Sequence, residues 1–130
     1  MTVAKQHEAQ EITGLLQRWN EALRTGDPAT VAALYASDAI LLPTVSNEVR
    51  KTPAAIRNYF EVFLKRRPRA RAIDQNIRLF DGLAINSGVY VISMLDNSIP
   101  TSVTCRYTFI YRWEDTGWKI IEHHSSAMPE

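Results

Sequence analysis

One apolar segment, Thr101–Trp113, contains a charged residue that packing alone does not explain. Its β-branched and aromatic composition is typical of a central strand, yet Arg106 lies near its middle. A guanidinium in that position lies on a wet or interfacial face of the sheet, forms a structural ion pair, or points into a cavity where its planar fork holds a carboxylate. We therefore take Arg106 as the first candidate ligand-binding residue.

The returning segment, Trp118–Ser125, contains a second candidate, His124. Strict alternation along a strand places His124 and its neighbour His123 on opposite faces, so the two cannot converge on one metal ion, and no metal site is expected. If His124 faces a cavity near Arg106, it can orient a ligand or move a proton near neutral pH. A half-buried, hydrogen-bonded histidine is an equal alternative. A one-residue error in strand parity would exchange His123 for His124.

Further polar side chains that could line a cavity come from other parts of the chain. Arg50 precedes a predicted helix, where a solvated loop arginine is the simpler interpretation. The hydroxyl groups of Tyr35, Tyr59 and Tyr90 either reach a cavity or are the polar tips of packed core residues. Ser125, beside His124, lacks the Gly-x-Ser-x-Gly turn and the oriented carboxylate of a nucleophilic serine, so no serine hydrolase is predicted.

Length and composition predict a single globular domain over residues 1–130. The chain is 45% hydrophobic and 22% charged, with a net charge of +1. This balance argues against a nucleic-acid scaffold, and the basic cluster Lys65–Arg71 is interpreted as a solvated helix end.

No apolar stretch approaches the length of a membrane span, so a cytoplasmic protein is expected by default. The single cysteine, Cys105, is expected to be buried and inert, and no cofactor is expected.

Three helices are predicted before the long strands. Apolar residues at spacings of 3 and 4 indicate an amphipathic helix from about Ala4 to Arg24. Asp27-Pro28 and Thr52-Pro53 each join a capping side chain to a proline suited to the first helical position. A short helix should begin at the first pair, and a helix reaching about Lys65 at the second.

The remaining segments alternate as strands do. A short strand, Asp38–Pro43, and a small hairpin over Val45–Val49 are predicted between the helices. Ala70–Phe80 and Leu83–Leu95 flank an Asp-Gly turn, with Gly88 as a plausible bulge. With the two segments described first, they make four long antiparallel strands. The fold class is therefore α+β, a cone-shaped curved antiparallel sheet wrapped around three N-terminal helices.

This order resembles the nuclear-transport-factor-2-like superfamily of cone-shaped, cystatin-like domains. The superfamily resemblance is carried by Arg24–Asp27, Leu34–Ala39 and Gly117–Ile120. A closer resemblance, to the branch of the calcium/calmodulin-dependent kinase II association domain, with polyketide-cyclase (SnoaL)-like domains as relatives, is carried by Leu41–Thr44, Arg106–Phe109 and His123–Ser126. The resemblance implies a helix-lidded cone with an arginine-bearing pocket for small acids, and a sheet face used for oligomerisation.

We therefore predict a homo-oligomer, a dimer or larger, whose pocket binds a small carboxylic acid through Arg106, His124 and a tyrosine. The alternative is a small-molecule isomerase, lyase, hydrolase or polyketide-cyclase-like enzyme that uses His124 and Arg106. Against it, the superfamily's ketosteroid isomerases place a catalytic aspartate where this chain has Leu42, and Thr101–Trp113 contains no carboxylate. A purely structural partner of another chain is the third option, and it predicts a cone filled by its own side chains.

Overall fold

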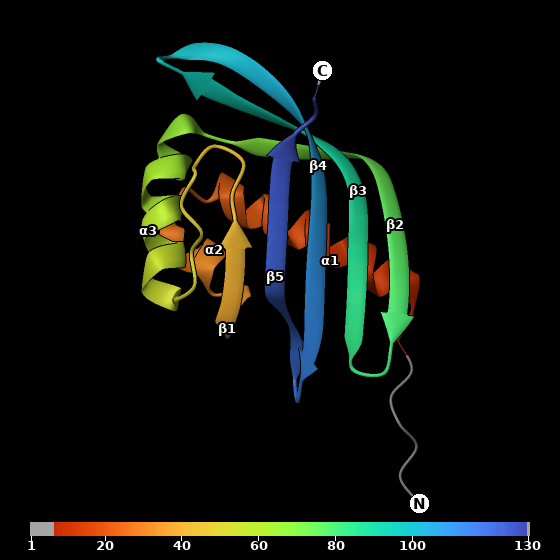
Figure 1. Ribbon diagram of the computed structural model, residues 1–130. Helices are drawn as coiled ribbons and strands as arrows, with labels where there is room; N and C mark the ends of the chain where they lie inside the picture. Colours follow the sequence, from red (N-terminus) through yellow and green to blue (C-terminus); the bar gives the residue numbers. More distant parts are fainter. Residues whose placement is uncertain (1–6, 130) are drawn as a thin grey trace, which may run out of the picture.

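The helices lie against one face of a single curved sheet (Figure 1). The computed structural model describes residues 7–129. Its elements in chain order are α1 (Ala9–Arg24), α2 (Pro28–Ala32), β1 (Tyr35–Leu42), α3 (Pro53–Phe63), the 3-10 turn η1 (Leu64–Arg66), β2 (Arg69–Phe80), β3 (Leu83–Asp96), β4 (Ile99–Glu114) and β5 (Gly117–Ala127). Among the described residues, none of the helices combines the length and hydropathy needed to cross a bilayer.

The predicted caps begin two of the helices. The side chain of Asp27 accepts a hydrogen bond from the backbone N–H of Ala29 at 3.2 Å, and that of Thr52 accepts one from Ala55 at 3.1 Å. These bonds satisfy amides that have no partner within the helix. Helix α1 buries the predicted stripe, and its predicted start at Ala4 lies outside the described residues.

The sheet has the strand order β1-β5-β4-β3-β2, and β2 to β5 form the predicted antiparallel hairpins. Strand β1 joins the other side of β5 in parallel, a pairing that the sequence pattern did not predict. The predicted hairpin over Val45–Val49 is wrong: these residues form a loop. The loop closes because Leu41 and Arg50 exchange two backbone hydrogen bonds of 2.9 Å, which fixes the start of the Arg50 side chain.

Bulges in β5 and β2 change which way the side chains face along these strands. In β5, Glu122 pairs with Ile110 and Ile120 pairs with Tyr111, so Ile121 is an extra residue without a cross-strand partner. Ile120 and His123 are consequently both buried, although strict alternation would place them on opposite faces. The second bulge lies in β2 at Ile73, not at Gly88 as predicted.

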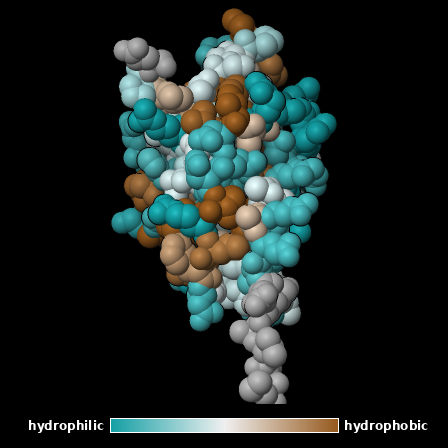
Figure 2. All heavy atoms as spheres, turned by 90° about the vertical axis from the view of Figure 1, so that its right-hand side faces the viewer, coloured by the Kyte–Doolittle hydropathy of each residue, from teal (hydrophilic) through white to brown (hydrophobic). Residues whose placement is uncertain are grey.

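The interior face of the sheet is aromatic and the outer face is largely polar. Cys105, Tyr107, Phe109 and Tyr111 of β4 point toward the helices and are buried, so the prediction of a buried cysteine is confirmed. The alternate residues of β4 face outward. Figure 2, which views the β2 side, shows apolar groups scattered between polar ones. The largest exposed apolar side chain of β2 is Phe80, at 55% exposure.

Candidate functional site

The first two candidate residues lie on the outer face of the sheet. Arg106 is exposed and pairs with Val89 and Ser126 in the neighbouring strands. His124 is also exposed and lines a shallow outer groove beside Glu48. The placement of both side chains inside the cone is therefore corrected. For Arg106 the reason is the ordinary alternation of β4, and for His124 it is the bulge at Ile121.

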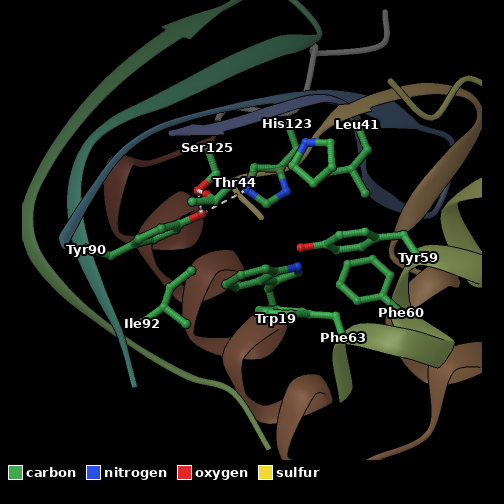
Figure 3. Close-up of a pocket in the computed structure, with 11 residues that line it drawn as sticks. Trp19, Leu41, Thr44, Tyr59, Phe60, Phe63, Tyr90, Ile92, His123 and Ser125 are labelled. Carbon is green, nitrogen blue, oxygen red and sulfur yellow. Dashed lines mark hydrogen bonds between the residues drawn. The ribbon is translucent and has the colours of Figure 1, made fainter. Parts of the chain in front are cut away.

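The interior of the cone contains a small cavity, which we call the cone cavity (Figure 3). It is lined by Trp19, Leu41, Pro43, Thr44, Tyr59, Phe60, Phe63, Tyr90, Ile92, His123 and Ser125. The volume open to the centre of a water molecule is about 10 Å³, which is room for roughly one water. This is the filled interior that the purely structural alternative predicts, so a ligand site has to be sought elsewhere.

A chain of hydrogen bonds crosses the interior through His123. Trp19 Nε1 donates to the Tyr35 hydroxyl at 3.1 Å, which lies 2.8 Å from His123 Nδ1. His123 Nε2 lies 3.2 Å from the Tyr90 hydroxyl, which donates to Ser125 Oγ at 2.7 Å. The chain continues through Thr44, whose hydroxyl contacts both Ser125 Oγ and the Cys105 sulfur. Each member can therefore donate to the next.

The direction of this chain determines the protonation of His123. The Tyr90 hydroxyl uses its proton for Ser125, so Nε2 of His123 donates to the Tyr90 oxygen. In the neutral imidazole that burial favours, Nδ1 then accepts from the Tyr35 hydroxyl, whose oxygen accepts from Trp19. Burial, with a smaller contribution from the charge of His124, lowers the pKa of His123 from 6.5 to about 3. The imidazole is thus a structural element and not a base poised near neutral pH.

The predicted tyrosines occupy three different environments. Tyr35 uses its hydroxyl for Trp19 and His123 and does not line the cone cavity. Tyr90 does line it, and burial raises the pKa of both phenols. Tyr59 points its hydroxyl into the same cavity (Figure 3) and also lines a second pocket. Burial raises the pKa of Tyr59, while the nearby charges of Arg66 and Arg50 act to lower it.

A fourth tyrosine, Tyr111, allows the stability contributed by the interior hydrogen bonds to be tested. Tyr111 is 2% exposed, and its hydroxyl has no hydrogen-bond partner among the described residues. Tyr111→Phe should raise the free energy of unfolding by about 1 kcal/mol, because it removes an unsatisfied buried hydroxyl. Tyr90→Phe is the matched comparison and should lower it by about 1–2 kcal/mol. Urea denaturation measures both; a loss of stability in Tyr111→Phe would contradict the expectation.

The second pocket, which we call the mouth pocket, opens beside the loop that follows β1. Its volume is about 190 Å³, and it is lined by Val45, Ser46, Arg50, Tyr59, Val62, Phe63 and Arg66. It adjoins the cone cavity, because Tyr59 and Phe63 line both. Two guanidinium groups therefore lie around a partly apolar pocket, where an anion with a small apolar body is the complementary ligand.

The hydrogen bonds of Arg50 engage one edge of its guanidinium and leave the buried Nε of the other edge without a partner among the described residues. Its side chain is 12% exposed, and its Cζ lies 5.8 Å from the centre of the Tyr59 ring. Nη1 donates to the Ala55 carbonyl at 3.2 Å and to Asn58 Oδ1 at 2.9 Å. Nε has no partner among the described residues, and Nη2 has a 3.6 Å ion pair with the exposed Glu48 carboxylate. The Nε–Nη2 edge is the one that binds a carboxylate through two parallel bonds.

The structure thus brings together Arg50 and Tyr59 and leaves Arg106 and His124 outside. Sequence reasoning missed His123, which the bulge turns inward, and Arg66, which was assigned to a solvated cluster. A signal for Arg66 did exist: it follows Tyr59 and Phe63 at spacings of 7 and 3, which is one face of a continuing helical segment. For His123 the sequence held no comparable signal.

Comparison with known proteins identifies one family that matches nearly the whole chain. Residues 8–129 match the calcium/calmodulin dependent protein kinase II association domain. A crystal structure from Xanthomonas campestris, assigned to that association domain, is 47% identical, with a TM-score of 0.92 over 100% of this chain and 94% of that one.

Two more distant structures are similar in fold. A nuclear transport factor 2-like superfamily protein from Salmonella enterica is 17% identical, with a TM-score of 0.80 over 93% of this chain and 91% of its own. The hub of the S. rosetta kinase is 14% identical, with a TM-score of 0.79 over 96% of this chain and 100% of its own. Because the family match covers nearly the whole chain, and the Xanthomonas relative is 47% identical along it, this chain belongs to the calcium/calmodulin-dependent protein kinase II association domain family.

Proposed function

We propose that this chain is an oligomerising assembly domain whose mouth pocket binds a small organic carboxylate. The observation that carries the ligand proposal is the guanidinium of Arg50. Its Nε is buried without a hydrogen-bond partner among the described residues, while Nη1 is held by Ala55 and Asn58. An unsatisfied buried donor costs about 1–3 kcal/mol, and a bound carboxylate would recover that cost.

The rest of the mouth pocket supports a small acid over a large one. Val45, Val62 and Phe63 supply apolar contact surface, and Arg66 supplies a second positive charge. The volume of about 190 Å³ is below the range usual for drug-sized ligands, so the ligand has few heavy atoms. Glu48, the present ion-pair partner of Arg50, has a side chain that is 72% exposed, so a ligand carboxylate can displace it at little cost.

The experiment compares acids with their uncharged isosteres. Benzoate and butyrate should raise the melting temperature and give saturable calorimetric titrations, whereas benzamide and butyramide should not. At 100 times its dissociation constant a ligand adds about 2.7 kcal/mol, which for a domain of this size corresponds to roughly 8–13 °C. Protein concentration is held constant throughout, because assembly also shifts the melting temperature.

Three variants locate the binding site. Arg50→Lys keeps the charge but loses the fork, and should weaken benzoate binding at least about tenfold, or 1.4 kcal/mol. Arg66→Gln should also weaken it. Arg106→Gln, on the outer face, is the matched control and should bind as the wild type does. Equal responses to acid and amide, or a loss of binding in Arg106→Gln alone, would contradict a carboxylate site at the mouth pocket.

The assembly part of the proposal concerns the outer face of the sheet. Support comes from the family, whose solved members include the S. rosetta hub, and from apolar residues of this face: Ile85, Val89, Val91 and Ile110 are only partly buried in the single chain. These residues belong to the neighbouring strands β3 and β4 and surround Arg106 on the outer face, where a second copy of the chain would cover them.

Light scattering after size-exclusion chromatography tests the assembly. The wild type should elute with a mass that is a multiple of the 14.8 kDa chain. Ile110→Asp should shift the protein toward the single chain, because an interface would bury the new charge. Ile99→Asp, a change at a site that is 65% exposed in the β3–β4 hairpin, is the control and should assemble normally. A wild type that is monomeric at about 100 µM would overturn this part of the proposal.

A further inference from the structure

A cluster of two tryptophans and a carboxylate lies beside the β4–β5 turn, away from the mouth pocket. Trp113 and Trp118 are directly paired across the two strands, and their rings meet at 73° with centroids 5.4 Å apart. Trp118 Nε1 donates to the Glu11 carboxylate at 2.8 Å, which ties this pair to the first turn of α1. The three side chains form two perpendicular aromatic walls and one anionic wall.

The side chain of His7 fills the space between these walls. Its ring centroid lies 4.6 Å from that of each tryptophan. Its Nδ1 lies 3.1 and 3.0 Å from the two oxygens of Glu11 and donates to them, because a carboxylate only accepts. The imidazole is 10% exposed, although it belongs to the segment that precedes α1.

Two aromatic rings and a carboxylate arranged in this way favour one class of ligand. The faces of indole rings carry negative potential and attract cations within about 6 Å, and aromatic cages of this kind recognise alkylated ammonium groups. A carboxylate in the wall adds a charge that a neutral ligand cannot use. The walls are also held independently of His7, by the strand pairing and by the Trp118–Glu11 hydrogen bond.

We propose that Glu11, Trp113 and Trp118 form a cage for an organic cation of the alkylammonium class, and that His7 is its internal occupant. A cation supplied from outside competes with His7 for the same walls. The cage thereby couples the position of the His7 side chain to ligand binding. This proposal is independent of the mouth pocket and of assembly.

Choline and 3,3-dimethylbutan-1-ol provide the test, because they have nearly the same shape and differ in charge. Tryptophan fluorescence of the full chain is titrated with each. His7→Ala should bind choline with at least tenfold preference over the alcohol, and at least threefold more tightly than the wild type, in which His7 competes. Glu11→Gln in the His7→Ala background should lose at least tenfold in affinity. In the wild type, choline should shift the His7 ring signals in proton NMR.

The proposal fails if His7→Ala shows no saturable response to choline, or responds equally to the alcohol. It also fails if His7→Ala binds choline no better than the wild type does, since His7 would then not occupy the cage. Circular dichroism confirms the fold of each variant. Should His7→Ala prove unfolded, His7→Gln, which keeps a donor for Glu11 but no aromatic ring, takes its place with the same expected order of affinities.

Discussion

Acidification from pH 7.5 to 4.5 is expected to lower the free energy of unfolding by roughly 2–3 kcal/mol through His123 alone. The folded state holds this imidazole neutral, with a pKa of about 3, whereas its ordinary value is 6.5. Below pH 6.5 the unfolded chain therefore binds a proton that the folded chain does not. The stabilisation is almost complete above about pH 7.5 and is lost progressively as the pH falls through 6.5 toward 3.

The main physical origin of this effect is burial, which disfavours the charged imidazole and so lowers the pKa of His123. Protonating Nδ1 would turn the hydrogen bond that it accepts from the Tyr35 hydroxyl into one that it donates, and the Tyr35 proton would lose its acceptor. A charge on the imidazole would also be buried against Phe109, whose ring is stacked on it at 3.9 Å. Both costs fall on the folded state only.

Urea denaturation between pH 7.5 and 4.5 measures the effect. His123→Gln should lose about 1–3 kcal/mol at pH 7, because Tyr35 and Tyr90 lose their partner. Between pH 7.5 and 4.5 its free energy of unfolding should fall by roughly 2–3 kcal/mol less than that of the wild type. His124→Gln, on the exposed side of the same strand, should follow the wild-type profile. Carboxylates that titrate in this range contribute equally to all three proteins. Parallel profiles for His123→Gln and the wild type would contradict the assignment.

Gly88→Ala is expected to lower the free energy of unfolding by about 3 kcal/mol or more. A Cβ at this position would lie 2.0 Å from the carbonyl oxygen of Asp74 and 2.7 Å from its carbonyl carbon. The bulge at Ile73 brings this backbone close, and Asp74 is held in the ladder of β2 and β3 by its pairing with Val89. Because both groups are backbone, neither can turn away as a flexible side chain would.

Gly14→Ala is the matched control, with an effect of opposite sign. A Cβ there meets nothing within 4 Å, and the residue lies inside α1. Replacing an internal helical glycine with alanine should raise the free energy of unfolding by roughly 0.5–1 kcal/mol. Urea denaturation of both variants decides the matter. A Gly88→Ala variant as stable as the wild type would show that β2 can move away from β3 at the bulge.

The sequence alone determined the helices, the long strands and the fold class, although not the loop after β1. Asp27 and Thr52 cap the helices that their proline pairs predicted, and the Asp81-Gly82 turn joins the predicted strands. Such signals lie within a few residues of the structure that they specify, so no tertiary information is needed to interpret them. The association-domain resemblance was likewise visible in short segments and is confirmed by the family match.

The site was determined only in the tertiary structure. Whether His123 or His124 faces the core depends on one extra residue, Ile121, which has no partner in the β4–β5 ladder. Arg50 becomes a candidate anion ligand because its backbone is bridged to Leu41 and its Nη1 to α3. Periodicity assumes an unbroken ladder, and a bulge results from contacts between distant segments, so the parity of β5 could not be derived from local pattern.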